Sequence, residues 1–161
     1  MPGAGRRPPK RIEPYVGISL IRTHRAFRQS GEWKLARLGL RLGQELILLQ
    51  LAAQDAHSQS RLAEQLGVEQ ATVSIMLRRM EKVGLVRRRT DRGDARVTRV
   101  CVTRKGRSLI APVRRLWREQ ERNLLKGLSD KDKRTLGELL SRMRANMESR
   151  RPAHDGRAKN K

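Results

Sequence analysis

The chain has 161 residues, and its 38 Lys and Arg against 16 Asp and Glu give a formal net charge of +22. A charge of this size attracts polyanions whatever the fold, which favours a nucleic acid as the partner. Aromatic residues make up only 2% of the chain. This scarcity argues against single-stranded nucleic acids, whose bases usually stack on aromatic side chains. The length suits one domain, alone or with a dimerisation element.

Several classes of protein are excluded by what the sequence lacks. It has no run of about 18 apolar residues to span a membrane, and no apolar stretch behind the basic N-terminus to make a signal peptide. His24, His57 and His154 form no spaced metal set, and no Gly-rich phosphate loop or nucleophile motif occurs. We therefore expect no enzyme, no metal and no cofactor. With the single cysteine Cys101, these features indicate a protein of the reducing cytoplasm.

The two ends of the chain differ from its middle. Residues 1–14 and 150–161 are basic, broken by Pro and Gly, and without apolar periodicity, so we expect disordered basic tails. A mixed helical pattern predicts a first helix over residues 16–29, which ends at a break formed by Ser30 and Gly31. The strongly apolar segment Gly43–Gln54 predicts a buried helix.

The most informative segment is Ser58–Gly84, which predicts a helix, a tight turn and a second helix. Ser58 is placed to cap the first helix, and Gly67 stands where the backbone must take a positive φ. The inner face is expected to bury Leu62, Ala63, Val73, Met76, Leu77 and Met80. The residues expected to point outward are Gln70, Ser74, Ile75 and Arg78. Ile75 also fits a place in the core. This pattern is typical of a DNA-binding helix-turn-helix.

A hairpin is predicted directly after the helix-turn-helix. Its strands are Leu85–Thr90 and Arg96–Thr103, and the polar tip Asp91–Asp94 separates them, so the hairpin has the position of a wing. Its register stays open because Val97, Val100 and Val102 cannot all share one face. The segment Asp55–His57 is expected to be a short loop.

Two long helices are predicted at the end, from Arg104 to about Lys126 and over Asp130–Glu148. Ser129 is placed to cap the second, and Asp130 and Asp132 suit its first turn. Each helix carries an apolar stripe, and such stripes commonly need a partner to cover them. We therefore expect a dimer, and we assign Trp117 to the packing between subunits.

Three segments together resemble the MarR family (multiple-antibiotic-resistance regulator) of bacterial winged-helix transcription factors, from about Val16 to Met147. They are SRLAEQLGVEQATVSIMLRRMEKVGLVRRR, DRGDARVTRVCVTRKGRSLI and GLSDKDKRTLGELLSRM. The resemblance implies a mainly α fold with a small β-hairpin wing, in one domain over residues 15–149. The winged helix-turn-helix would span about 35–103, and N- and C-terminal dimerisation helices would span about 16–29 and 104–149. The family also implies a symmetric dimer on a pseudo-palindrome.

In this geometry the second helix of the pair enters the major groove of DNA. Gln70 would contact adenine and Arg78 guanine or a phosphate, while Arg92 at the wing tip suits the minor groove. Asp94 would stabilise the wing by holding Arg96, which reaches a phosphate. The candidate DNA contacts are Ser58, Gln70, Ala71, Thr72, Ser74, Ile75, Arg78, Arg79, Arg92 and Arg96. The alternative for the helix arginines is a solvated face.

The resemblance implies a sequence-specific regulator of transcription that binds double-stranded DNA, expected to be a homodimeric repressor. The alternative is a weakly specific, nucleoid-associated architectural protein, because a charge of +22 supports tight non-specific binding by itself. Family members are often released from DNA by small aromatic acids, so we expect a small aromatic or anionic effector near Arg22, His24 and Arg25. For His24 the alternative is ordinary packing. Cys101, in a strand, is expected to be inert.

Overall fold

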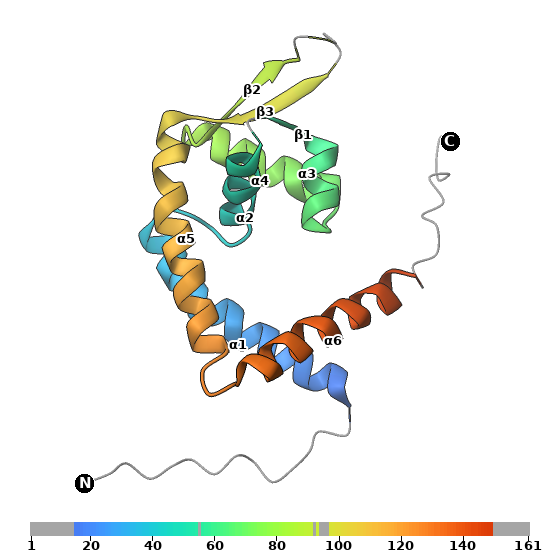
Figure 1. Ribbon diagram of the computed structural model, residues 1–161. Coiled ribbons are helices and arrows are strands. Elements are labelled where there is room, and N and C mark those ends of the chain that lie inside the picture. The colour runs from blue at the N-terminus through green and yellow to red at the C-terminus, as the bar shows by residue number, and fades with distance from the viewer. Residues whose placement is uncertain (1–14, 55, 92, 94–96, 150–161) are drawn as a thin grey trace, which may run out of the picture. The chain divides into compact units, whose positions relative to one another are not determined.

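The computed structural model describes residues 15–54, 56–91, 93 and 97–149 (Figure 1). Its elements in chain order are α1 (Val16–Arg37), α2 (Gln44–Ala53), β1 (His57–Ser58), α3 (Gln59–Leu66), α4 (Gln70–Lys82), β2 (Val86–Thr90), β3 (Thr98–Val102), α5 (Arg104–Leu124) and α6 (Asp130–Glu148). The predicted class, mainly α with a small hairpin wing, is confirmed. Described residues up to Glu121 form one compact unit and those from Arg122 a second, so each unit is described by itself.

The first helix is longer than predicted. The expected break at Ser30 and Gly31 is wrong, because α1 continues without interruption to Arg37. Gly31 instead allows α5 to approach closely, since a Cβ there would lie 2.8 Å from Nε2 of Gln120. The same Nε2 donates a hydrogen bond to Oγ of Ser30 at 3.0 Å. An ion pair of 2.7 Å between Lys34 and Glu119 fixes the next turn.

The predicted helix-turn-helix is confirmed. Oγ of Ser58 accepts the backbone N–H of Arg61 at 3.2 Å and so caps α3. Gly67 ends α3 with a φ of +64°, a conformation that side chains with a Cβ rarely adopt. The N–H of Val68 then bonds back to the carbonyl of Ala63 at 3.1 Å. The core between α3 and α4 is formed by Leu62, Ala63, Val73, Leu77 and Met80, all buried, whereas Met76 is only partly buried.

The sheet has three strands in the order β1-β3-β2, all antiparallel. The hairpin register pairs Val86 with Val102 and Thr90 with Thr98. This settles the open question of β3: Val100 and Val102 are both buried, whereas Val97 precedes the strand. The expected loop over residues 55–57 is wrong at His57, which pairs with Val100 in β1. A strand of two residues is too short to show the alternation of apolar and polar residues by which strands are predicted from sequence.

The last helix begins as predicted. Ser129 and Asp132 form a reciprocal capping box, in which Oγ of Ser129 accepts the N–H of Asp132 at 3.2 Å. None of the residues of α6, all of which the structure describes, is buried. Leu139 and Met147 are both exposed. The apolar stripe of this helix is therefore uncovered in a single chain. Among the described residues, no helix combines the length and the apolar character needed to cross a membrane.

Candidate DNA interface and adjoining cavity

Helix α4 has one buried face and one exposed face. Val73 and Leu77 are at most 1% exposed, whereas Ala71, Arg78 and Arg79 are exposed on the opposite side. Ile75 belongs to this outward face, with 48% of its surface accessible, so its alternative place in the core is wrong. The exposed face thus presents apolar and guanidinium groups together, the combination that contacts base edges and phosphates in a major groove.

The N-terminal end of α4 also carries polar candidates. Gln70 and Thr72 are exposed, and Ser74 is half-buried. The backbone carbonyl of Gln70 accepts a hydrogen bond from Nε2 of Gln59 at 3.3 Å, which leaves the amide side chain of Gln70 available. Ser58 is half-buried and its hydroxyl already caps α3. Its contact with DNA stays a prediction.

The three predicted wing-tip residues, Arg92, Asp94 and Arg96, lie outside the described residues. Within the described hairpin, an ion pair links Asp91 to Arg99. Oδ1 of Asp91 also accepts the N–H of Gly93 at 2.8 Å. Among the described residues, Asp91 is thus the carboxylate that braces the tip end of the wing strands, a role that was not predicted for it. Its position, directly after the last residue of β2, is a typical one for Asp in a turn.

Strand β2 adds positive charge beside α4. Arg87, Arg88 and Arg89 are all exposed, and α4 contacts β2. Glu81 of α4 accepts the backbone N–H of Arg88 at 3.3 Å and lies 3.8 Å from its guanidinium. This pair ties the strand to the helix. The exposed cations of α4 and β2 therefore belong to one connected structural element, which a phosphate backbone would attract.

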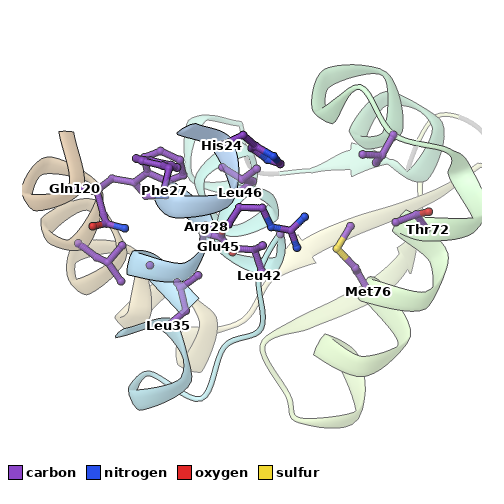
Figure 2. Close-up of a pocket in the computed structure, with 15 residues that line it drawn as sticks. His24, Phe27, Arg28, Leu35, Leu42, Glu45, Leu46, Thr72, Met76 and Gln120 are labelled. Carbon is purple, nitrogen blue, oxygen red and sulfur yellow. The ribbon is translucent and has the colours of Figure 1, made fainter. Parts of the chain in front are cut away.

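A cavity of about 510 Å³ adjoins the inner side of α4 (Figure 2). Its walls come from α1, α2, α4 and α5 and from the turn before α4, all within the first compact unit. Met76 and Thr72 of α4 line it, and Figure 2 shows them facing the side chains of α1 and α2. A Cβ on Gly43 would lie 2.9 Å from Sδ of Met76, so α4 and the start of α2 are in close contact there.

One of the three predicted effector residues lines the cavity. His24 does so, whereas Arg22 and Arg25 are exposed on α1 and are absent from the lining. Arg28 takes part instead. It lies four residues after His24, on the same side of the helix, and this spacing is the signal that could have found it.

Two buried polar atoms of the cavity lack hydrogen-bond partners among the described residues. Glu45 is only 2% exposed, and neither its Oε2 nor Nε1 of Trp117 has a hydrogen-bond partner among the described residues. Burial raises the pKa of the Glu45 carboxyl, while the N–H groups of Glu45 and Gly43 and the charge of Arg28 oppose this rise. The ring of Trp117 packs on that of Phe27, with centroids 5.7 Å apart. Within the protomer, Trp117 therefore lines this cavity, a role that its assignment to the dimer interface had missed.

Comparison with known proteins identifies relatives of this chain. A model of the MarR family matches residues 40–98. The transcriptional regulator YybA of Bacillus subtilis is 27% identical over 111 residues, which are 69% of this chain and 74% of YybA. Two further curated regulators are matched over 56% and 57% of their own lengths.

Solved structures match over most of the chain. The transcriptional regulator PA3341 is 34% identical with a TM-score of 0.75, covering 84% of this chain and all of that one. The complex of Staphylococcus aureus MepR with DNA is 25% identical with a TM-score of 0.79, covering 84% and 99%. These likenesses confirm the winged-helix fold.

Proposed function

Because the chain belongs to the MarR family of transcriptional regulators, we propose that it is a homodimeric repressor of a pseudo-palindromic operator, released from DNA by a small molecule. As a member of that family it is a DNA-binding regulator and not an enzyme. The observation that carries the proposal is the outward face of α4. Ile75, Arg78 and Arg79 are exposed there, on a helix whose opposite face is fully buried.

The proposed contacts follow from the positions on α4. Gln70 forms a bidentate contact with adenine, and Arg78 with guanine or a phosphate. Ala71 and Ile75 pack on thymine methyl groups. The remaining proposed contacts are Ser58, Thr72, Ser74, Arg79 and the wing residues Arg92 and Arg96, which Asp94 supports.

Uncovered apolar surface supports the homodimer. Tyr15, Val16 and Ile21 at the start of α1 are about two-thirds exposed, at 68%, 70% and 67%. On α6, Leu139 and Met147 are exposed too. Burying such surface is favourable by about 25 cal/mol per Å², and a second copy of the chain is the partner that the family implies. Sedimentation equilibrium should give twice the mass of the chain.

The test of DNA recognition compares two variants. Arg78→Ala should weaken binding and lower the slope of log affinity against log salt by about 1. Gln70→Ala should relax the preference at one base pair. Arg142→Ala removes the same charge from the exposed surface of α6, which is not part of the helix-turn-helix, and is the matched control. The variants are compared with wild type in gel-shift titrations on a cognate duplex. If neither Arg78→Ala nor Gln70→Ala changes the affinity or the base preference, the proposed docking of α4 in the major groove is wrong.

The rival function is architectural, and the net charge of +22 is the observation that favours it. The two functions differ in the affinity for the protein's own promoter fragment relative to random duplex, at about 0.15 M salt. A repressor requires a large ratio. A ratio near one would support the architectural function.

The cavity is the proposed effector site. It shares Met76 and Thr72 with α4 and His24 and Arg28 with α1, so a ligand that fills it contacts the recognition helix and the first helix at once. A ligand shifts DNA binding only if it binds the DNA-binding conformation and the released conformation with different affinities. We propose His24 and Arg28 as the polar contacts from α1, in place of Arg22 and Arg25.

A further inference from the structure

Three consecutive backbone carbonyls follow α4, and the start of α5 binds all three. The carbonyl of Val83 accepts a hydrogen bond from Nζ of Lys105 at 2.9 Å. That of Gly84 accepts one from Oγ1 of Thr103 at 2.6 Å, and that of Leu85 accepts the backbone N–H of Thr103 at 3.1 Å. We call these five residues the α4–α5 joint. Carbonyls at the end of a helix have no partner inside it, and here their partners fasten α4 to another helix.

The hydroxyl of Thr103 serves both helices at once. It accepts the backbone N–H of Gly106 at 3.1 Å, which is the bond that caps the N-terminus of a helix. A cap needs only this accepting role, yet the same hydroxyl also donates its single proton to Gly84. Gly84 has a φ of +72°, the left-handed conformation in which helices commonly end. The first turn of α5 is therefore bound to the turn that ends α4.

The joint is closely packed as well as hydrogen-bonded. Val86 and Val102 pair at the base of the hairpin beside it, and both are buried. Gly106 lies so close to them that a Cβ there would be 2.8 Å from Cγ2 of Val102. A change in the angle between α4 and α5 therefore has to break the hydrogen bonds of the joint.

A small change of this angle has a large effect at the far end of α5. The helix has 21 residues, and at 1.5 Å per residue it is about 31 Å long. A tilt of about 6° displaces its far end by about 3.4 Å, which is the rise of one base pair. In a dimer, the distance between two half-sites on DNA mirrors the distance between the two recognition helices. The angle at the joint therefore bears on the spacing that a dimer accepts.

We propose that Thr103 and Lys105 are positioning residues, which set the angle between α4 and α5 and so determine the half-site spacing that this protein accepts in DNA. In this role neither residue contacts DNA. The inference rests on the proposed homodimer, in which α5 is one of the dimerisation helices. It goes beyond base recognition by α4, because a single helix cannot read the distance between two half-sites.

The test measures how the full-length protein tolerates altered spacing. A cognate duplex is selected from a random-sequence pool with wild type, and two derivatives carry one base pair inserted or deleted between the half-sites. Wild type should bind each derivative at least about tenfold more weakly, because the second α4 no longer meets its half-site. Thr103→Val keeps the shape of the side chain and removes the hydroxyl, so this loss should shrink to within about threefold.

Ser108→Ala is the matched control. It removes a hydroxyl from the same end of α5, where Oγ of Ser108 donates to the carbonyl of Lys105 at 2.8 Å within the helix. Because this bond does not reach α4, the control should keep the spacing preference of wild type. Circular dichroism shows whether each variant is folded before its affinity is measured.

Lys105→Met separates positioning from an electrostatic contact with DNA. A positioning role predicts a weaker spacing preference and an unchanged slope of log affinity against log salt on the cognate duplex. A lysine that contacts a phosphate would instead lower the slope by about 1 on all three duplexes and leave the spacing preference intact. That result would overturn the assigned role. This variant keeps the cap of α5, so the inference can be tested even if Thr103→Val does not fold.

The remaining outcomes are equally decisive. Variants that keep the spacing preference of wild type would overturn the inference and leave the homodimer standing. An equal loss of affinity on all three duplexes would show that the joint stabilises the fold without setting the spacing. If wild type itself binds the three duplexes equally, the proposed recognition by a homodimer fails, and this is seen before any variant is made.

Discussion

Gly106 lies where α5 begins, against the backbone at the base of the wing. A Cβ on Gly106 would overlap the carbonyl oxygen of Leu85 and lie 2.8 Å from Cγ2 of Val102. The side chain of Val102 is buried, and the carbonyl of Leu85 is held in place because it accepts the N–H of Thr103 at 3.1 Å. Relief of the overlap therefore requires α5 to move away from the sheet.

The substitution Gly106→Ala sets two effects against each other. In an open helix, alanine is more favourable than glycine by about 1 kcal/mol. Overpacking of a close contact costs about 1–3 kcal/mol and occasionally more. Since the overlapped atom belongs to an anchored backbone, we place the cost at the upper end and expect a net loss of about 2 kcal/mol in the free energy of unfolding.

Gly137→Ala in α6 is the matched control. A Cβ there meets no atom within 4 Å, so this variant should gain about 0.5–1 kcal/mol from helix propensity alone. Both variants are compared with wild type by urea unfolding, followed by circular dichroism at one protein concentration, because the stability of a dimer depends on concentration. A Gly106→Ala variant as stable as wild type, or stabilised like the control, would refute the reasoning.

Three further predictions concern single side chains. Burial raises the pKa of Glu45 above 4.5, so the folded state holds the proton more tightly and the free energy of unfolding falls as pH rises from 4.5 through the raised pKa. The urea midpoint of Glu45→Gln minus that of wild type should therefore increase with pH across this window. A difference that stays constant with pH would contradict the prediction. Leu77→Ala removes a side chain that is 1% exposed and should cost about 2–5 kcal/mol in urea unfolding; an unchanged midpoint would argue against its place in the core. Ser129→Ala breaks the capping box of α6 and should cost about 1 kcal/mol. The loss of the cap should be visible as faster hydrogen exchange of the backbone amides in the first turn of α6. Unchanged exchange rates would contradict the prediction.

The sequence by itself determined the features that depend on neighbouring residues. Ser58 and Ser129 cap helices through bonds to residues three positions on, and Gly67 takes the positive φ that its turn requires. The bounds of α4 follow from apolar spacing between two turns. Such features need no distant partner, so the helix-turn-helix and with it the exposed side of α4 could be predicted.

Contacts between distant residues decided the rest. Glycine often breaks a helix, yet Gly31 lies inside α1. It faces Gln120 of α5 at a distance that leaves no room for a side chain. His57 is in a strand only because β3 pairs with it. Glu45 looks like an ordinary acidic residue in the first turn of a helix, yet the surrounding helices bury it beside the cavity. Burial and hydrogen bonding depend on which helices and strands pack against one another. No local pattern of residue types specifies that packing.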